Sequence, residues 1–441
     1  MAEPELIKLI LVKDFHVFHN RKQRNAFHEI VDKNLFFAID DHWKRLRAIV
    51  SPTFTSGKVK KMSSLIDECT KNCLENLEFH VNNKKNMNLK KVFGSFTMDC
   101  IAKCAFGTDI DANKNADNPF VVNAKQLFTI KTLKILLTNL LPIFLLRLFR
   151  IKSVFNEENN QFFIRVARHI IRKRRESNQM YNDFLQLLMD CQSNENNKKE
   201  VQLDSESHYL NEEQEESELE TLKFHSGKKE LTEDEIVAQA WVFFLAGYET
   251  TASTLSYCTH ELALNQNVQE KLYQEIKCSA DKNGEIDYET LAKLPYLDAV
   301  ISETLRKYPP VTRLERLVCQ DNYKLANTGI TLNKGDLVEI PVYAMHHSEE
   351  FYPSPEKFKP ERFLPENRHL INPYAYLPFG SGPRNCVGMR FGLLESKLAL
   401  SKVILKYKFE RSSKTQDPLQ FYPLRRVLSV KKGVFVKILK R

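Results

Sequence analysis

Apolar residues recur every three to four positions along most of this chain, a spacing that predicts amphipathic helices. Helices are expected at Glu5–Lys13, from His42 onward, at Lys58–Glu78, Leu89–Phe106, Gln161–Arg175, Asp183–Cys191 and Leu231–Leu262, between Pro295 and Pro310, and at Met389–Leu405. Short runs at Arg313–Cys319, Tyr323–Leu332 and Leu337–Tyr343 predict strands, with turns at Thr328-Gly329 and Lys334-Gly335. The expected fold class is therefore α+β, mainly α with a small β subdomain.

The longest predicted helix opens with a complete start signal, Leu231-Thr-Glu-Asp-Glu-Ile236. Thr232 can cap the first turn while Glu235 reaches back to it, and Leu231 can pack onto Ile236. From Ile236 to Gly247 the pattern is apolar nearly all round. This helix should therefore pass through the interior of the molecule.

Two segments depart from the amphipathic pattern. Phe120–Phe149 is strongly apolar, but Lys134, Pro142 and Arg147 interrupt it, so it is too short and too broken to span a bilayer. It is either core or an apolar lip above a substrate channel that dips into a membrane surface. The stretch 193–230 is rich in Asn, Glu, Ser and Lys, which predicts a flexible acidic connector within one domain.

The charge balance is mildly basic, with 65 Lys and Arg against 56 Asp and Glu, a net charge of +9 over 441 residues. Basic runs occur at Lys44-Arg45, Lys58–Lys61 and Arg172–Arg175 without interleaved aromatic residues or a nucleic-acid motif. Nucleic acid is therefore not an expected partner. These runs form either a solvated face or a docking surface for an acidic protein or an anionic lipid.

Nine cysteines lie mostly in apolar helical stretches, which is typical of reduced thiols in a cytosolic compartment. Cys69 and Cys73 are four positions apart, as are Cys100 and Cys104, so each pair shares a helix face. A metal site made from these pairs is an alternative, but core packing explains them more simply. His346 and His347 are expected on a strand, where neighbours face opposite sides, which argues against a metal pair.

One cysteine has a different setting, the stretch Phe379-Gly-Ser-Gly-Pro-Arg-Asn-Cys386-Val-Gly388. Its glycines allow backbone angles and close approaches that larger residues cannot adopt. Cys386 would lie at the start of the next helix, where free N–H groups and the helix dipole favour a thiolate. A thiolate held in this way suits an iron atom, and Arg384 can neutralise a carboxylate of the same cofactor. An inert buried cysteine is the alternative.

Three further polar groupings interrupt predicted helices. Ala246-Gly-Tyr-Glu-Thr-Thr251 places helix-disfavouring residues in the buried central helix, where they either bend it or serve chemistry. Trp43 and Arg47 are four positions apart, and Glu303 and Arg306 are three apart, so each pair shares a helix face. Taken singly, such pairs are more often packing contacts or surface ion pairs.

Taken together and in this order, these motifs resemble the cytochrome P-450 family over essentially the whole chain, and most closely its animal microsomal family 3, subfamily A type. Phe-x-x-Gly-x-Arg-x-Cys-x-Gly resembles the family's haem-binding loop, in which Cys386 would be the axial thiolate of haem b. The resemblance implies the cytochrome P-450 fold, one catalytic domain over 1–441, with haem between the long central helix and the cysteine loop with its helix.

The resemblance also implies roles for other residues. Thr250 would hydrogen-bond dioxygen, Glu249 would relay protons, and Glu303 would join Arg306 and Arg362 in a brace on the thiolate side. The other cofactor contacts implied are Phe379, Gly380, Arg384, Gly388, Trp43, Arg47, Arg21, Arg316 and Ala246. The implied substrate pocket contains Phe36, Phe37, Leu245, Val311 and Thr312.

The implied reaction is monooxygenation of a lipophilic substrate, xenobiotic or steroid-like, with one oxygen atom of O2 inserted and the other reduced to water. Electrons would come from NADPH through a flavoprotein reductase docked near Lys44, Arg45 and Lys397, with cytochrome b5 as a second partner. The implied location is the cytosolic face of the endoplasmic reticulum membrane. Two alternatives are a thiolate-haem peroxide isomerase, against which Glu249-Thr250 argues, and a haem-binding fragment without turnover.

The start of the chain also differs from the family pattern. Full-length members begin with a membrane anchor, a proline-rich hinge, a first helix and two strands, and Met1 here coincides with the helix that follows them. We therefore expect a catalytic domain that lacks the anchor, the first helix and the first strands.

Overall fold

The computed structural model describes residues 1–22, 28–82, 87–112, 114–115, 117–127, 137, 140–148, 155–177, 179, 181–193, 230–423 and 426–441. The predicted connector 193–230 lies outside the described residues except for its two ends. The apolar segment Phe120–Phe149 is described only in part, by α5 (Pro119–Leu127), α7 (Ile143–Leu148) and a few residues between them.

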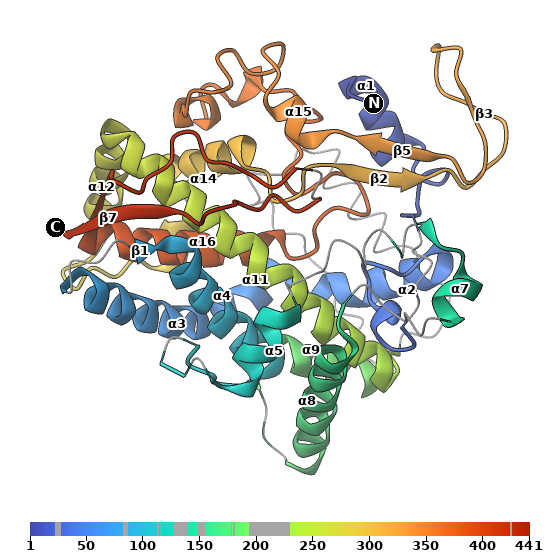
Figure 1. Ribbon diagram of the computed structural model, residues 1–441, viewed down its shortest axis with the longest axis horizontal. Helices are drawn as coiled ribbons and strands as arrows, with labels where there is room; N and C mark the ends of the chain where they lie inside the picture. Colours follow the sequence, from blue (N-terminus) through green and yellow to red (C-terminus); the bar gives the residue numbers. More distant parts are fainter. Residues whose placement is uncertain are drawn as a thin grey trace.

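Helices make up most of the described chain and surround α11 (Glu233–Leu264), which crosses the molecule obliquely (Figure 1). Before it come α1 (Pro4–Lys8), α2 (Asp40–Val50), α3 (Ser56–Asn82), α4 (Leu89–Phe106), α8 (Glu157–Glu176) and α9 (Phe184–Ser193). After it come α12 (Gln266–Ser279), α13 (Tyr288–Ala292), α14 (Pro295–Lys307), α15 (Val342–His346) and α16 (Met389–Lys406). The mainly α fold class is confirmed.

Short helical turns supplement these helices. The first predicted helix is divided, because α1 continues as a π-helical turn at Leu9–Lys13. Turns of 3-10 helix lie at Val31–Lys33, Ser51–Phe54, Pro360–Phe363 and Arg368–Leu370. Neither α12 nor α13 was among the predicted helices.

The central helix α11 starts where its sequence predicts. The Thr232 hydroxyl accepts from the Glu235 N–H at 3.3 Å, and Glu235 Oε2 accepts from the Thr232 N–H at 2.8 Å. Leu231 and Ile236 are both buried beside this capping box. Farther along, α4 packs closely on α11 at Gly247. A Cβ at this position would lie only 2.4 Å from Ile101 Cδ1. Glycine therefore permits this approach.

The strands form three small sheets among the described residues. β2 (Leu314–Leu317) pairs antiparallel with β5 (Leu337–Ile340), and β3 (Tyr323–Lys324) forms a hairpin with β4 (Thr331–Leu332). These four strands are the predicted β subdomain. The third sheet, in the order β1 (Met87–Asn88), β7 (Phe435–Lys440), β6 (Tyr407–Glu410), was not predicted.

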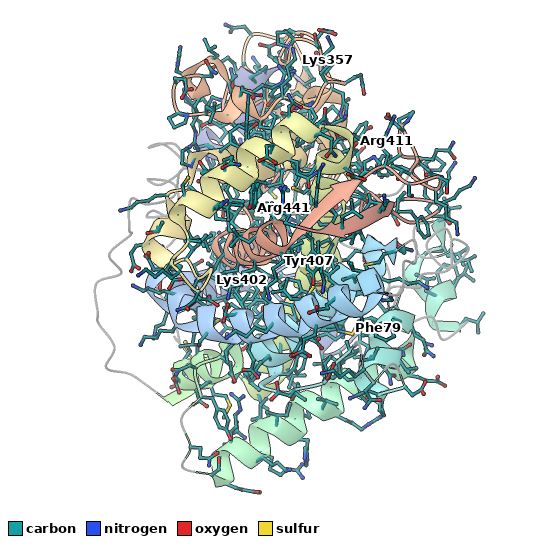
Figure 2. All side chains as sticks on the ribbon, turned by 90° about the vertical axis from the view of Figure 1, so that its left-hand side faces the viewer. Phe79, Lys357, Lys402, Tyr407, Arg411 and Arg441 are labelled. Carbon is teal, nitrogen blue, oxygen red and sulfur yellow. The ribbon has the colours of Figure 1, made fainter. Side chains whose placement is uncertain are left out.

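The C-terminal sheet lies at the C-terminal end of α16. Figure 2 labels Lys402, Tyr407 and Arg441 in this part of the molecule. Tyr407 begins β6 directly after α16, and the Arg441 N–H donates to the Lys406 carbonyl at 3.0 Å. Lys402 forms ion pairs with Asp67 of α3 and, at 2.6 Å, with Glu285. This anchoring holds α16 in place, and the N-terminal end of α16 carries the glycine-rich loop.

The predicted strand Leu337–Tyr343 is wrong in its second half. The strand ends at Ile340 because Pro341 has no N–H for the ladder, and α15 begins at Val342. His346 is therefore on a helix, where it accepts from the Leu377 N–H at 2.9 Å and contacts the Arg306 carbonyl at 3.0 Å. Burial lowers the pKa of His346 to about 3, so the ring is a neutral packing element.

The nine cysteines carry no disulfide, and Cys69, Cys73, Cys100 and Cys104 are buried. Within the residues that the structure covers, no group of three or more His, Cys, Asp or Glu side chains is arranged to bind a metal ion. The side chains of these four cysteines belong to the hydrophobic core. No helix in the described ranges is both long enough and apolar enough to cross a bilayer.

Candidate functional site

The glycine-rich loop brings Cys386 to an accessible position on an otherwise buried turn. Residues 381–385 are buried, whereas Cys386 is exposed. Gly382 has φ +71°, and a Cβ there would lie 1.8 Å from the Leu11 carbonyl oxygen, so the turn requires glycine. The Cys386 N–H donates to the Phe379 carbonyl at 2.8 Å, and α16 follows from Met389. The loop thus presents one sulfur at a helix N-terminus.

The middle of α11 has a similar accessible stretch between buried flanks. Residues 236–244 and 251–263 are buried, but Ala246 is exposed and Thr250 is partly exposed. The Thr250 hydroxyl donates to the Ala246 carbonyl at 2.7 Å. This carbonyl oxygen therefore accepts a hydrogen bond from a side chain within the helix. A Cβ on Gly392 of α16 would lie 3.8 Å from Thr251 Oγ1, so the two helices meet beside this stretch.

Four arginines converge beside the cysteine loop: Arg21, Arg47, Arg316 and Arg384. Arg47 Nη1 donates to the Asn385 carbonyl at 3.0 Å, and Arg21 Nη2 donates to the Arg384 carbonyl at 3.3 Å. The Arg384 guanidinium lies 4.4 Å from the centre of the buried Trp43 ring and donates to the Ala38 carbonyl at 2.7 Å. The predicted Trp43–Arg47 face of α2 therefore meets the loop.

Burial, and then repulsion among these cations, lowers the pKa of Arg384 to about 7 and that of Arg21 to about 10. The pKa of Arg316 falls to about 9 for the same two reasons. Among the residues that the structure describes, Arg316 Nε and Arg384 Nε and Nη1 are buried donors that find no acceptor. A cluster of buried, mutually repelling guanidiniums is unfavourable unless anions lie among them, and Glu315 offsets the lowering only in part at Arg21 and Arg316. The two carboxylates of a haem fit this requirement.

A buried carboxylate joins α14 to the segment before the loop. Glu303 accepts from Arg306 in bidentate fashion, at 2.8 Å from Nε and 2.9 Å from Nη2, and both side chains are fully buried. The Lys359 N–H donates to Glu303 Oε1 at 2.9 Å, and Arg362 Nε lies 3.5 Å from the same oxygen. Arg362 also donates to the Pro353 carbonyl at 2.7 Å. The predicted three-residue brace is thus assembled in space.

Glu249 has a cationic neighbour that the sequence pattern did not reveal. Lys90 Nζ of α4 lies 2.7 Å from Glu249 Oε1, and the two side chains are 19% and 22% exposed. Lys90 also bonds the hydroxyl of Ser253, one turn farther along α11. The carboxylate beside Thr250 is therefore held by α4 and can still reach water.

A pocket of about 300 Å³ brings Phe36 and Phe37 together with Arg21. The two phenylalanine rings pack edge to face at 5.2 Å, and the Arg21 guanidinium lies 4.3 Å from the Phe36 ring centre. Val311 and Thr312 lie against the C-terminal segment, where the Thr312 N–H donates to the Arg426 carbonyl at 2.9 Å. Arg426 also lines the pocket. Leu245 is partly buried against the core.

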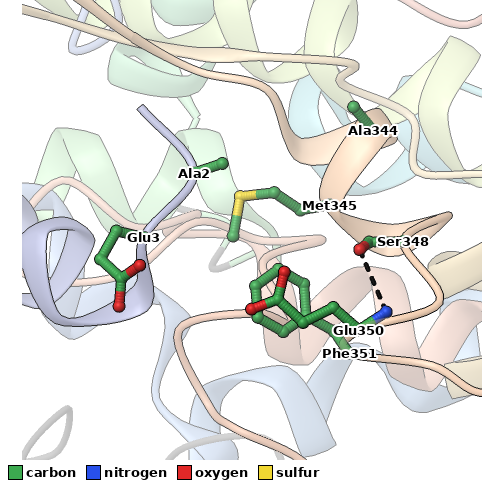
Figure 3. Close-up of a pocket in the computed structure, with 7 residues that line it drawn as sticks. All are labelled: Ala2, Glu3, Ala344, Met345, Ser348, Glu350 and Phe351. Atoms are coloured by element: carbon green, nitrogen blue, oxygen red, sulfur yellow. Dashed lines mark hydrogen bonds between the residues drawn. The ribbon is translucent and has the colours of Figure 1, made fainter.

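A second pocket, of about 270 Å³, lies between the start of the chain and α15 (Figure 3). Its lining includes Glu3, Met345, Glu350 and Phe351, and the Ser348 hydroxyl accepts from the Glu350 N–H at 3.3 Å. None of the predicted site residues lines it.

The docking role expected for Lys397 is wrong. Its side chain is 9% exposed, and its ammonium lies 2.5 Å from Asp298 Oδ1 and 3.0 Å from the Ala292 carbonyl. Arg45 is also engaged, since it bonds Glu235 and donates to the Glu230 carbonyl at 2.8 Å. Lys44 remains at the surface, paired with Asp41 at 3.0 Å. Asp298 and Glu235 therefore form ion pairs with basic side chains that the sequence alone predicts to be exposed on the surface.

Glu395 is a buried acid that the sequence analysis missed. It lies on α16 among leucines, is fully buried, and faces the side chains of Thr251 and Cys100. Burial raises its pKa to about 8. A single glutamate in the apolar run Gly-Leu-Leu-Glu-Ser is the signal that could have identified it.

Replacing Glu395 with glutamine is expected to flatten the pH dependence of stability. Because the folded pKa of about 8 exceeds the unfolded value, native Glu395 stays protonated while the unfolded chain ionises. The unmodified protein should lose on the order of 2–4 kcal/mol more than Glu395→Gln between pH 5 and pH 8. Urea unfolding at both pH values measures this difference. Parallel pH profiles for the two proteins would contradict the assignment.

Comparison with known proteins agrees with this geometry. A family model described as "Cytochrome P450" matches residues 1–438. The chain is 37% identical to cytochrome P450 3A11 of Mus musculus over 446 residues, which cover 100% of this chain and 82% of that protein. Identity and coverage are the same for cytochrome P450 3A2 of Rattus norvegicus. Cytochrome P450 3A29 of Sus scrofa is 36% identical over 446 residues, which cover 100% of this chain and 82% of that protein.

Proposed function

Because the chain belongs to the cytochrome P450 family, whose members are haem monooxygenases acting on lipophilic substrates, we propose that Cys386 provides the thiolate of its haem b. One observation carries this proposal: the sulfur is exposed in a turn whose preceding five residues are buried. Burying a turn while leaving one helix-start cysteine accessible is what a metal-binding thiolate needs.

When bound, the haem supplies oxygen activation, in which one atom of O2 enters the substrate and the other is reduced to water. Its two carboxylates would be held by the buried guanidiniums beside the loop, which then lose their mutual repulsion. The proposed contacts are Arg21, Arg47, Arg316, Arg384 and Trp43 at the carboxylates, Phe379, Gly380 and Gly388 on the cysteine side, and Ala246 on the α11 side.

We assign proton delivery to Thr250 and Glu249. The Thr250 hydroxyl donates to the Ala246 carbonyl, so its oxygen is free to accept a hydrogen bond from the accessible side of α11. Glu249 precedes it and is partly exposed, so its carboxylate can exchange protons with solvent. Lys90 holds that carboxylate toward α4.

Replacing Thr250 with alanine is expected to uncouple turnover. Without the hydroxyl, this chain would deliver protons less effectively, so peroxide should be released in place of product and product per NADPH should fall roughly tenfold or more. The assay measures product, peroxide and NADPH together. Thr254→Ala is the matched control, because Thr254 makes the same type of bond one turn later, to Thr250 O at 3.0 Å, but is buried. Equal coupling in Thr250→Ala and the native enzyme would refute the role.

Replacing Lys90 with methionine is expected to lower the coupling of NADPH use to product. The ammonium group holds the Glu249 carboxylate toward α4, so a neutral side chain would no longer keep that carboxylate in its position beside Thr250. Product per NADPH should fall, by less than in Thr250→Ala, and Lys90→Arg, which retains the charge, should restore it. Native coupling in Lys90→Met, with normal haem content, would contradict a role for this ion pair.

We propose NADPH–cytochrome P450 reductase as the electron donor, cytochrome b5 as a second partner, and the cytosolic face of the endoplasmic reticulum as the location, by analogy with the microsomal members of the family. We further propose bulky xenobiotics or steroids as substrates, with Phe36, Phe37, Leu245, Val311 and Thr312 at the pocket. Product formation that requires NADPH, reductase and O2 supports this proposal. Conversion of a peroxide substrate without NADPH would instead favour the isomerase.

A further inference from the structure

Gln239 is a buried amide of the central helix α11 that bonds the main chain of a segment lining the pocket of about 300 Å³. Its Oε1 accepts from the Leu35 N–H at 2.8 Å, and its Nε2 donates to the Lys33 carbonyl at 3.2 Å. Nε2 also donates to the Glu235 carbonyl of its own helix at 3.2 Å. Both atoms of this amide therefore connect α11 to the neighbouring segment.

The segment that Gln239 bonds carries the two phenylalanines of the pocket, and we call residues 33–37 the pocket wall. Asn34 is fully buried, and its Oδ1 accepts from the N–H of Phe36 at 2.8 Å and from the N–H of Phe37 at 3.0 Å. Asn34 lies in the chain between the two residues that Gln239 bonds. The position of both aromatic rings therefore depends on the Gln239 amide.

Gln239 projects from the same face of α11 as the residues proposed to lie on the oxygen side of the haem. Ala246 and Thr250 follow it by 7 and 11 positions, which places all three within about 20° of one direction at 3.6 residues per turn. Along the helix axis, Thr250 lies about 16 Å from Gln239 at 1.5 Å per residue. One continuous helix thus determines the spacing between the pocket wall and Thr250.

A second contact between the pocket wall and α11 lies at the surface and is weaker. Lys33 Nζ lies 2.8 Å from Asp234 Oδ2, and the two side chains are 38% and 30% exposed. An exposed ion pair contributes little, because water competes for both charges. The Leu35 N–H, by contrast, is buried, so losing its acceptor would leave an unpaired donor away from water. Gln239 is therefore the contact that determines where the pocket wall lies.

We propose that Gln239 is a positioning residue that sets the breadth of the substrate pocket and thereby the size of the lipophilic molecules that bind there. This role rests on the proposed function, in which Phe36 and Phe37 lie at the substrate pocket. Gln239 acts through the pocket wall and not on the substrate. Without its bonds the haem site should stay intact, but a large ligand would have to order the pocket wall when it binds, which lowers its affinity.

Gln269 of α12 provides a matched control within the same chain. It is also buried, and its Oε1 accepts from the Phe409 N–H at 2.8 Å. Its Nε2 donates to the Leu262 carbonyl at 2.8 Å and to the Phe409 carbonyl at 2.9 Å. Like Gln239, it connects a helix to a separate segment through both atoms of its amide, but that segment is β6, which does not line the pocket. Replacing either glutamine removes three hydrogen bonds of the same kind.

The test compares two ligands of haem iron: imidazole, and clotrimazole, an imidazole that carries three aryl rings. Their Kd values are measured by spectral titration of the haem-loaded unmodified enzyme, Gln239→Leu and Gln269→Leu. We expect Gln239→Leu to weaken clotrimazole binding roughly fivefold or more and to leave imidazole binding unchanged, because only the larger ligand reaches the pocket wall. Gln269→Leu should leave both Kd values unchanged. An unchanged clotrimazole Kd in Gln239→Leu, or equal losses in the two variants, would overturn the proposal.

A measurement on the unmodified enzyme tests the proposal without relying on the folding of a variant. Clotrimazole, but not imidazole, should slow amide hydrogen exchange in residues 33–37, because the larger ligand holds the pocket wall in place. Equal exchange with both ligands would overturn the proposal. Imidazole that gives no spectral change in the unmodified enzyme would refute the proposed haem site itself, whereas the other negative results refute only the role of Gln239.

Discussion

Replacing Glu303 with alanine is expected to leave little or no haem-loaded protein. Glu303 is fully buried, and its two oxygens receive both donors of the bidentate Arg306 and the Lys359 N–H. Alanine would leave the equally buried Arg306 guanidinium without its counter-charge, which costs about 3–5 kcal/mol. Because a domain has only about 5–15 kcal/mol of net stability, this loss removes much of it. Haem content per polypeptide and the urea midpoint measure the effect.

A surface glutamate in the same region gives the matched control. Glu361 is next to Arg362 and pairs with Lys271 at 2.8 Å, but the two side chains are 41% and 57% exposed. Glu361→Ala should change stability by no more than about 1 kcal/mol, because exposed ion pairs contribute little. Glu303→Ala with normal haem content and an unchanged midpoint would refute the brace. Similar losses in both variants would show that the effect is not due to burial.

The elements that the sequence predicted well are those with local signals. The start of α11 depends on Thr232 and Glu235, three residues apart, so the capping box is visible in the sequence and present in the structure. The strands β6 and β7 depend on pairing between Tyr407–Glu410 and Phe435–Lys440, which lie far apart in the chain. No local pattern specifies that partner, and this sheet was missed.

The candidate site shows the same division. Spacing alone places Trp43 and Arg47 on one face of α2, but only the folded chain brings Arg47 to the Asn385 carbonyl. Charged residues are the least predictable part, because tertiary contacts decide their exposure. Lys397 was expected at the surface and is buried against Asp298, whereas Lys90 drew no attention and lies on Glu249.

Replacing Cys386 with alanine is expected to abolish monooxygenase activity and the thiolate signature of the haem. The carbon monoxide difference spectrum of the reduced protein depends on which side chain would hold the haem iron, so it should lose the band typical of a thiolate. Product formation should fall by on the order of 10³-fold or more, because alanine cannot supply the negative charge of the sulfur. Haem content should fall less than product formation does, because the arginine cluster would still bind the two haem carboxylates.

The matched control for this change is Cys278→Ala. Cys278 is also exposed, but it lies in the last turn of α12, away from the glycine-rich loop. Its replacement should leave the difference spectrum and the activity unchanged.

If Cys386→Ala kept the thiolate band, another cysteine would have to be the ligand. Only the exposed or partly exposed cysteines could reach iron, and these are Cys191, Cys278 and Cys319. Cys319 follows the strand that carries Arg316, so Cys319→Ala in the same background would decide that case. A colourless Cys386→Ala protein would instead mean that the sulfur is needed for haem retention, and the arginine cluster alone would then be too weak to hold the cofactor.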